Sequence, residues 1–118
     1  MPVVGIVDDD EAVRTALSSL IRSTGYDAAL FASAEAFLSS ENRDQVDCLI
    51  IDICMPGLSG LELQRTLLEE NPGVPVIILS VYANELRARA LHQHAVAALQ
   101  KPLSDDALLG AIDLALAR

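Results

Sequence analysis

Runs of apolar residues alternate with segments of helical periodicity along the whole chain. Short apolar runs closed by turn residues are typical of buried strands, and apolar positions three or four residues apart are typical of amphipathic helices. The pattern predicts strands at residues 3–7, 26–31, 48–52, 75–79 and 95–100. It predicts helices at residues 11–23, 34–38, 61–70, 83–92 and 105–118.

This alternation predicts an α/β fold. Five strand–helix units with short connections favour a doubly wound (βα)5 domain, in which helices cover both faces of a five-stranded parallel sheet. Residues at the element ends agree with the boundaries. Asp10, Ser33 and Ser104 stand where helix N-caps are expected, and Gly25 stands where the first helix should stop. Residues 39–47 are polar and are predicted to form a loop.

Composition limits the size and the surroundings of this domain. The chain has 118 residues, enough for one domain over 1–118, and 52% of them are hydrophobic. The net charge of −9 argues against direct nucleic-acid binding and against anionic membrane surfaces, because both need a basic face. No apolar stretch approaches the ~20 residues that cross a bilayer, and no signal peptide is recognisable. A cytosolic location is expected.

The two cysteines fit that location. Cys48 and Cys54 lie six positions apart on one extended segment, which separates their Cα atoms by roughly 20 Å. That distance is too long for a disulfide. Two cysteines without neighbouring histidines do not make a zinc site either.

Polar residues follow four of the predicted strands, each at the same relative position. Asp8 and Asp9 follow the first strand, Asp52 closes the third, Ser80 ends the fourth and Lys101 follows the fifth. Ligands of open parallel sheets bind beyond the carboxyl ends of the strands. A solvated acidic loop could follow any one strand, but it does not explain this combination of carboxylates, hydroxyl and ammonium.

The combination suggests phosphoryl transfer to a carboxylate. Close carboxylates need a counter-charge, and Mg²⁺ suits them because it prefers oxygen ligands and links carboxylates to phosphate oxygens. Asp52 is the candidate nucleophile, which would form an acyl phosphate. Mg²⁺, the Lys101 ammonium and the Ser80 hydroxyl would then serve the three oxygens of the phosphoryl group.

The ordered motifs resemble the receiver domain of two-component response regulators. They are Ile6-Val7-Asp8-Asp9-Asp10 with Val13-Arg14, Ile51-Asp52-Ile53-Cys54-Met55-Pro56-Gly57, Ile78-Leu79-Ser80 and Lys101-Pro102. The resemblance implies a flavodoxin- or CheY-like sheet with strand order 2-1-3-4-5. It also implies Mg²⁺ held by Asp8, Asp9, Asp52 and the backbone carbonyl of Cys54, and phosphorylation of Asp52 by a sensor histidine kinase. The domain would catalyse only its own phosphorylation and dephosphorylation.

Within that family, the motifs look most like those of transcription regulators of the FixJ or NarL type, which usually carry a C-terminal DNA-binding domain. Phosphorylation would then switch the surface formed by residues 83–118, and so control a homodimer or an effector domain. Three residues near this surface depart from the usual family pattern, namely Ala98, where an aromatic is usual, His94 and Leu103. The signal could instead pass through repacking of Tyr82, Leu86 or Leu99.

Two other functions remain open on the sequence alone. A haloacid-dehalogenase-like phosphatase would use Asp8 as nucleophile and Asp10 as acid/base, although position favours Asp10 as a helix cap. A receiver-like interaction module would never use phosphate. Ser80 could cap the helix that follows it, and Lys101 taken alone would be read as a surface lysine.

Overall fold

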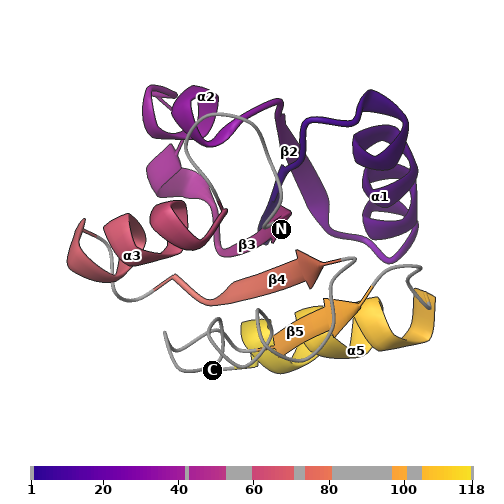
Figure 1. Cartoon of the computed structure of the whole chain (residues 1–118). Helices are drawn as coiled ribbons and strands as arrows, with labels where there is room; N and C mark the ends of the chain where they lie inside the picture. Colours follow the sequence, from indigo (N-terminus) through magenta and orange to yellow (C-terminus); the bar gives the residue numbers. More distant parts are fainter. Residues whose placement is uncertain are drawn as a thin grey trace.

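The computed structural model describes residues 2–41, 43–52, 60–70, 74–80, 97–100 and 105–117. Its centre is a five-stranded parallel sheet in the order β2-β1-β3-β4-β5 (Figure 1). The strands are β1 (Val3–Val7), β2 (Asp27–Phe31), β3 (Cys48–Asp52), β4 (Val76–Ser80) and β5 (Ala97–Gln100). The predicted parallel α/β sheet and its strand order are confirmed.

Helices lie on both faces of the sheet. The described helices are α1 (Glu11–Ser23), α2 (Ala34–Leu38), α3 (Gly60–Glu70) and α5 (Asp105–Leu116). α1 and α5 pack on one face, whereas α2 and α3 pack on the other (Figure 1). This is the doubly wound arrangement, and it places the topological switch between β1 and β3. The helix predicted at 83–92 lies outside the described residues.

Each face of the sheet has its own apolar core, because successive side chains of a strand point to opposite faces. In β3, Leu49 and Ile51 pack with α2 and α3, whereas Cys48 and Ile50 pack with α1 and α5. All four are fully buried. An uninterrupted apolar run is therefore what a central strand covered on both faces requires.

The helix boundaries follow from local hydrogen bonds. The side chain of Asp10 accepts hydrogen bonds from the backbone N–H groups of Ala12 (2.9 Å) and Val13 (3.3 Å), so it is the N-cap of α1. Ser33 Oγ caps α2 in the same way. Gly25 ends α1 with a φ of 94°, a conformation that glycine adopts without a Cβ clash. These three predictions are confirmed; Ser104 lies outside the described residues.

The segment predicted as a loop differs from expectation. It contains a 3-10 helix, η1 (Arg43–Gln45), followed by Val46, which is buried in the core beneath α2 and α3. A single apolar residue among polar neighbours gives no periodic signal, so the sequence could not identify it. Elsewhere the predicted strand ends move by only one or two residues.

The register of the strands determines what meets at the edge of the sheet. β1 and β3 pair with Val4 opposite Cys48 and Val7 opposite Ile51. Continued by one residue, this register brings Asp8 level with Asp52. The same edge receives the end of β4, where Ser80 pairs with Gln100 of β5. Residues far apart in the sequence are thus gathered beyond the carboxyl ends of adjacent strands.

Candidate functional site

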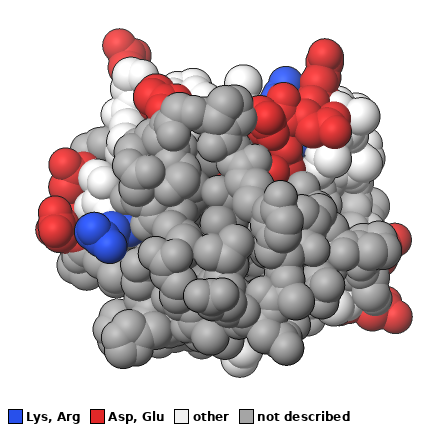
Figure 2. Space-filling view, in the orientation of Figure 1, with Lys and Arg blue, Asp and Glu red and all other residues white. Residues whose placement is uncertain are grey.

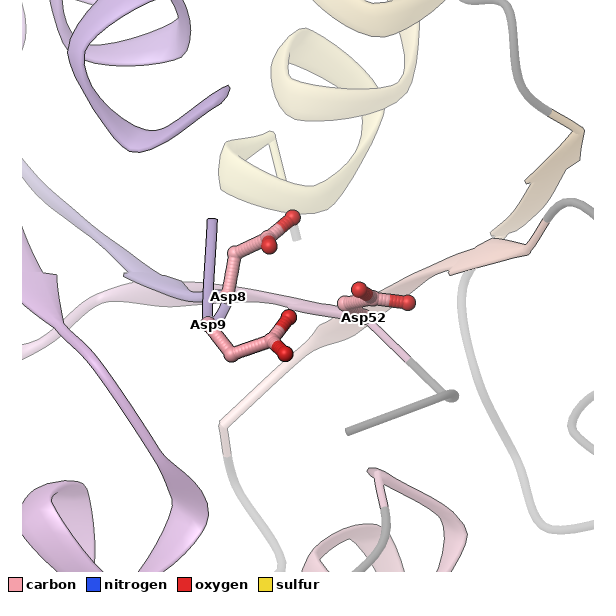
Figure 3. A group of neighbouring side chains, drawn as sticks. All are labelled: Asp8, Asp9 and Asp52. Atoms are coloured by element: carbon pink, nitrogen blue, oxygen red, sulfur yellow. The ribbon is translucent and has the colours of Figure 1, made fainter. Parts of the chain in front are cut away.

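Three carboxylates converge where β1 and β3 end. Asp8, Asp9 and Asp52 each place a carboxylate oxygen within 4.8 Å of the other two, and the three side chains extend into the same space (Figure 3). Asp52 is the last residue of β3, and Asp8 and Asp9 directly follow β1. The sequence-based prediction that these three residues form one cluster is confirmed.

The cluster is buried on one side and open on the other. Asp8 is 1% exposed and Asp52 is 6% exposed, whereas Asp9 is exposed. Removing carboxylates from water costs free energy that an apolar residue would not cost. Two buried carboxylates beside an accessible one are therefore an arrangement for binding or chemistry rather than for stability.

Hydrogen bonds fix the short segment that carries Asp8 and Asp9. The backbone N–H of Asp8 donates to the carbonyl of Phe31 in β2 (3.1 Å), and the backbone N–H of Asp10 donates to Asp8 Oδ1 (2.9 Å). The Asp8 carbonyl accepts a hydrogen bond from Arg14 Nη1 in α1 (2.7 Å). The main chain and side chain of Asp8 are thus held by β2, by the start of α1 and by an arginine.

The spacing of the sequence motifs does not indicate a role for Arg14, which belongs to the motif Val13-Arg14. One signal in the sequence points to it. A cation near the N-terminal end of a helix interacts unfavourably with the helix dipole, so an arginine at this position indicates a role other than helix stability. A group of acidic side chains with a basic one beside them lies near α1 on the surface drawn in Figure 2.

Asp10 has a different role from its two neighbours. Its carboxylate is engaged with the first turn of α1, as described above, and its side chain is exposed. It does not belong to the cluster formed by Asp8, Asp9 and Asp52. This placement counts against the phosphatase alternative, in which Asp10 would act as the acid/base.

Three other predicted site residues lie partly or wholly outside the described part of the structure. The backbone of Ser80 ends β4 at the edge that carries the cluster, but its side chain lies outside the described part of the structure. Lys101, which follows β5, and Cys54 lie outside the described residues. Their roles remain predictions.

The donor set fits a hard divalent cation. The three residues supply carboxylate oxygens and no nitrogen or sulfur, which is the ligand chemistry of Mg²⁺ rather than of zinc or copper. A divalent ion would also offset the concentrated negative charge. Asp8, Asp9 and Asp52 are accordingly the residues that would hold it.

Cys48 lies in the same strand as Asp52 but takes no part in this chemistry. Burial, followed by the nearby charge of Asp47, raises the pKa of its thiol to about 12. The thiolate is the reactive form of cysteine, so Cys48 is an apolar core residue and not a nucleophile. It is a free thiol, as predicted.

Comparison with known proteins identifies the family. The family model for the response regulator receiver domain matches residues 4–113. The response regulator protein TodT of Pseudomonas putida is 44% identical over 115 residues, which cover 97% of this chain and 51% of TodT. The transcriptional regulatory protein FixJ of Bradyrhizobium diazoefficiens is 34% identical over 112 residues, covering 94% of this chain and 55% of FixJ.

Solved structures agree. A response regulator receiver domain protein from Clostridium thermocellum superposes with a TM-score of 0.92 at 26% identity, and the match covers 100% of this chain and 96% of that one. The chain spans about half the length of the curated relatives it matches. Among the described residues, no helix is both long and apolar enough to cross a membrane. By its matched family model, its sequence relatives and its fold, the chain belongs to the receiver domains of two-component response regulators.

Proposed function

We propose that this receiver domain accepts a phosphoryl group on Asp52 from the phosphohistidine of a sensor histidine kinase. The observation that carries the proposal is the convergence of Asp8, Asp9 and Asp52 within 4.8 Å at the carboxyl ends of β1 and β3. A carboxylate oxygen of Asp52 would attack phosphorus as the P–N bond to the kinase imidazole breaks. The bond formed is the P–O bond of an acyl phosphate, and the imidazole leaves with the electron pair of the broken bond.

Each remaining residue has a proposed part in this transfer. Asp8, Asp9, Asp52 and the Cys54 carbonyl would hold Mg²⁺, which supplies charge neutralisation for the phosphoryl oxygens when it is bound. Ser80 and Lys101 would donate hydrogen bonds to the oxygens left over. The register of β4 and β5, which brings the ends of these strands to the cluster's edge, supports both assignments.

The output is proposed from the relatives. TodT is named a response regulator, FixJ is named a transcriptional regulatory protein, and each is about twice the length matched here. We infer that residues 1–118 are the receiver part of a regulator whose effector domain, a transcriptional one, lies outside this sequence. Phosphorylation would bias a two-state equilibrium of the surface around α5, and so change dimerisation or effector contacts. The cytosolic location remains a prediction.

Mass spectrometry of the intact chain tests the phosphoacceptor. After incubation with acetyl phosphate and Mg²⁺, the native chain should gain the mass of one phosphoryl group, and Asp52→Asn should gain none. The adduct should be lost in hydroxylamine, which cleaves acyl phosphates but leaves phosphoserine intact. Glu69→Gln, a charge-neutralising change at an exposed position of α3, is the matched control and should be labelled like the native chain. Labelling of Asp52→Asn at the native level would refute the assignment.

A further inference from the structure

A hydrogen bond from Arg14 to the Asp8 carbonyl links two segments of the chain beside the acidic cluster. Arg14 lies in α1, and Asp8 lies six residues earlier, just beyond β1. At 2.7 Å the hydrogen bond is short, as is expected of a bond from a charged donor. It is partly buried, so water competes for it less than at a fully exposed site. The bond therefore ties the beginning of α1 to the end of β1.

Helix stability does not explain why an arginine occupies this position. The N-terminal part of a helix carries positive partial charge, so a cation there gains least from the helix dipole. Arg22 provides the contrast, because it lies in the last turn of the same helix, where a cation is favourable. What Arg14 has instead is a hydrogen bond to a residue of the carboxylate cluster.

The segment between these anchors carries both Asp8 and Asp9. Asp8 is held at its N–H by Phe31 and at its carbonyl by Arg14, and its Oδ1 accepts the N–H of Asp10. Asp10 is in turn held by its capping bonds. Asp9 lies between these two fixed residues, so they constrain the path of its backbone. We propose that Arg14 is a positioning residue that holds Asp8 and Asp9 in the geometry that binds a divalent cation.

The inference rests on the proposed function, because Mg²⁺ is the ion that the cluster is proposed to bind. It can be separated from a simple charge effect, because the two predict opposite signs. If Arg14 acted only as a nearby positive charge, its removal would strengthen cation binding. If it positions the aspartates, its removal weakens binding, since outer hydrogen bonds orient metal ligands.

Arg22 supplies a matched control. It also donates a hydrogen bond from its guanidinium to a backbone carbonyl six residues away, that of Ala28 (3.3 Å), but at the opposite end of α1. Arg22→Gln therefore removes the same charge and the same kind of bond without touching the segment that carries Asp8. Titration calorimetry should show Mg²⁺ binding about tenfold weaker in Arg14→Gln and unchanged in Arg22→Gln.

Arg14→Lys separates the effect of the planar guanidinium from the effect of the charge, because lysine keeps the charge but not the planar donor group. We expect Arg14→Lys to weaken Mg²⁺ binding as well, and should Arg14→Gln not fold, Arg14→Lys carries the measurements alone. Native or tighter Mg²⁺ binding in the Arg14 variants would overturn the proposal.

A second readout needs no metal. In metal-free protein, the amide of Asp10, which donates to Asp8 Oδ1, should exchange its hydrogen faster in the Arg14 variants than in the native chain and in Arg22→Gln. Exchange at the native rate would overturn the proposal. If the native chain binds no Mg²⁺ and is not phosphorylated, the proposed function fails, and amide exchange still decides whether Arg14 positions this segment.

Discussion

The interior of β3 and its carboxyl end are both buried but have opposite chemistry. Cys48, Leu49, Ile50 and Ile51 are fully buried apolar residues, and Asp52, the next residue along, is only 6% exposed. Burial of the apolar residues stabilises the fold, whereas burial of a carboxylate costs free energy. The same strand therefore supplies stability along its length and the proposed phosphoacceptor at its end.

β1 repeats this division. Val4, Ile6 and Val7 are fully buried, and Asp8 follows at 1% exposure. Because β1 and β3 are adjacent and parallel, their interiors share the cores and their ends share the site. Substitutions inside these strands should therefore change stability, and substitutions at their ends should change function with little loss of stability.

The strand interior should show the largest effect on stability. Ile50→Ala removes a fully buried side chain from the core beneath α1 and α5 and leaves a cavity. We expect the free energy of unfolding, measured by urea denaturation, to fall by about 3 to 4 kcal/mol. Leu114→Ala is the control, since Leu114 is 60% exposed and its truncation should change stability by less than about 0.5 kcal/mol. Similar losses in the two variants would contradict the division.

A glycine in β1 should show the next largest effect. A Cβ on Gly5 would lie 2.7 Å from Leu49 Cδ1 and 3.1 Å from Val46 Cγ1, both in the core. We expect Gly5→Ala to lower the free energy of unfolding by about 1 to 3 kcal/mol, because the buried neighbours must shift.

Two further variants test whether steric contact causes the effect of Gly5→Ala. A Cβ on Gly110 of α5 would meet no atom within 4 Å, so Gly110→Ala should raise stability by about 0.5 to 1 kcal/mol through helix propensity. Leu49→Val shortens the side chain that the new Cβ would meet, so it should cost less in the Gly5→Ala background than alone. A loss from Gly110→Ala as large as that from Gly5→Ala would show that steric contact is not the cause.

Much of this organisation is readable from the sequence because it depends on local pattern. The apolar run of β3 needs no partner to be recognised, and the capping roles of Asp10 and Ser33 depend on neighbours two or three residues away. The convergence of Asp8 and Asp52 was also predictable, because parallel strands in a doubly wound sheet present their carboxyl ends together.

The remainder depends on tertiary contacts that leave no periodic trace. Val46 packs in the core beside Gly5, a glycine that the pattern treats as any other strand residue. The role of Arg14 follows from one hydrogen bond to a backbone carbonyl, which any residue type at position 8 would offer. Which side chains use the backbone as a partner is decided only by the folded geometry.

The pH dependence of stability should report on the buried thiol of β3. Burial raises the pKa of Cys48 to about 12 from the ordinary 9.0, so the unfolded chain loses this proton first. The contribution of the buried thiol to the free energy of unfolding is complete below pH 9 and is lost as pH rises toward 12. At pH 10 the native chain should have lost roughly 1.4 kcal/mol more than Cys48→Ala, each relative to its own value at pH 7.

Equal losses in the native chain and Cys48→Ala would show that the thiol does not carry this dependence. The hydrogen bond to Asp113 raises the pKa of the Tyr26 hydroxyl, so this group adds its own pH dependence at alkaline pH. That contribution is common to both proteins and cancels in the comparison. Denaturation by urea at a series of pH values provides the measurement.

The end of β3 should show a smaller change in stability than its interior, and in the opposite direction. Asp52→Asn removes one charge from three carboxylates whose oxygens lie within 4.8 Å of one another. Without metal, we expect its free energy of unfolding to rise by roughly 1 kcal/mol, because like charges at this distance repel. Glu69→Gln, at an exposed position away from the cluster, should change little. Adding Mg²⁺ should then stabilise the native chain more than Asp52→Asn, since a bound ligand stabilises the state that binds it. If metal-free Asp52→Asn is less stable than the native chain, this carboxylate supports the fold. The division between a stabilising strand interior and a strand end that serves function would then not hold at Asp52.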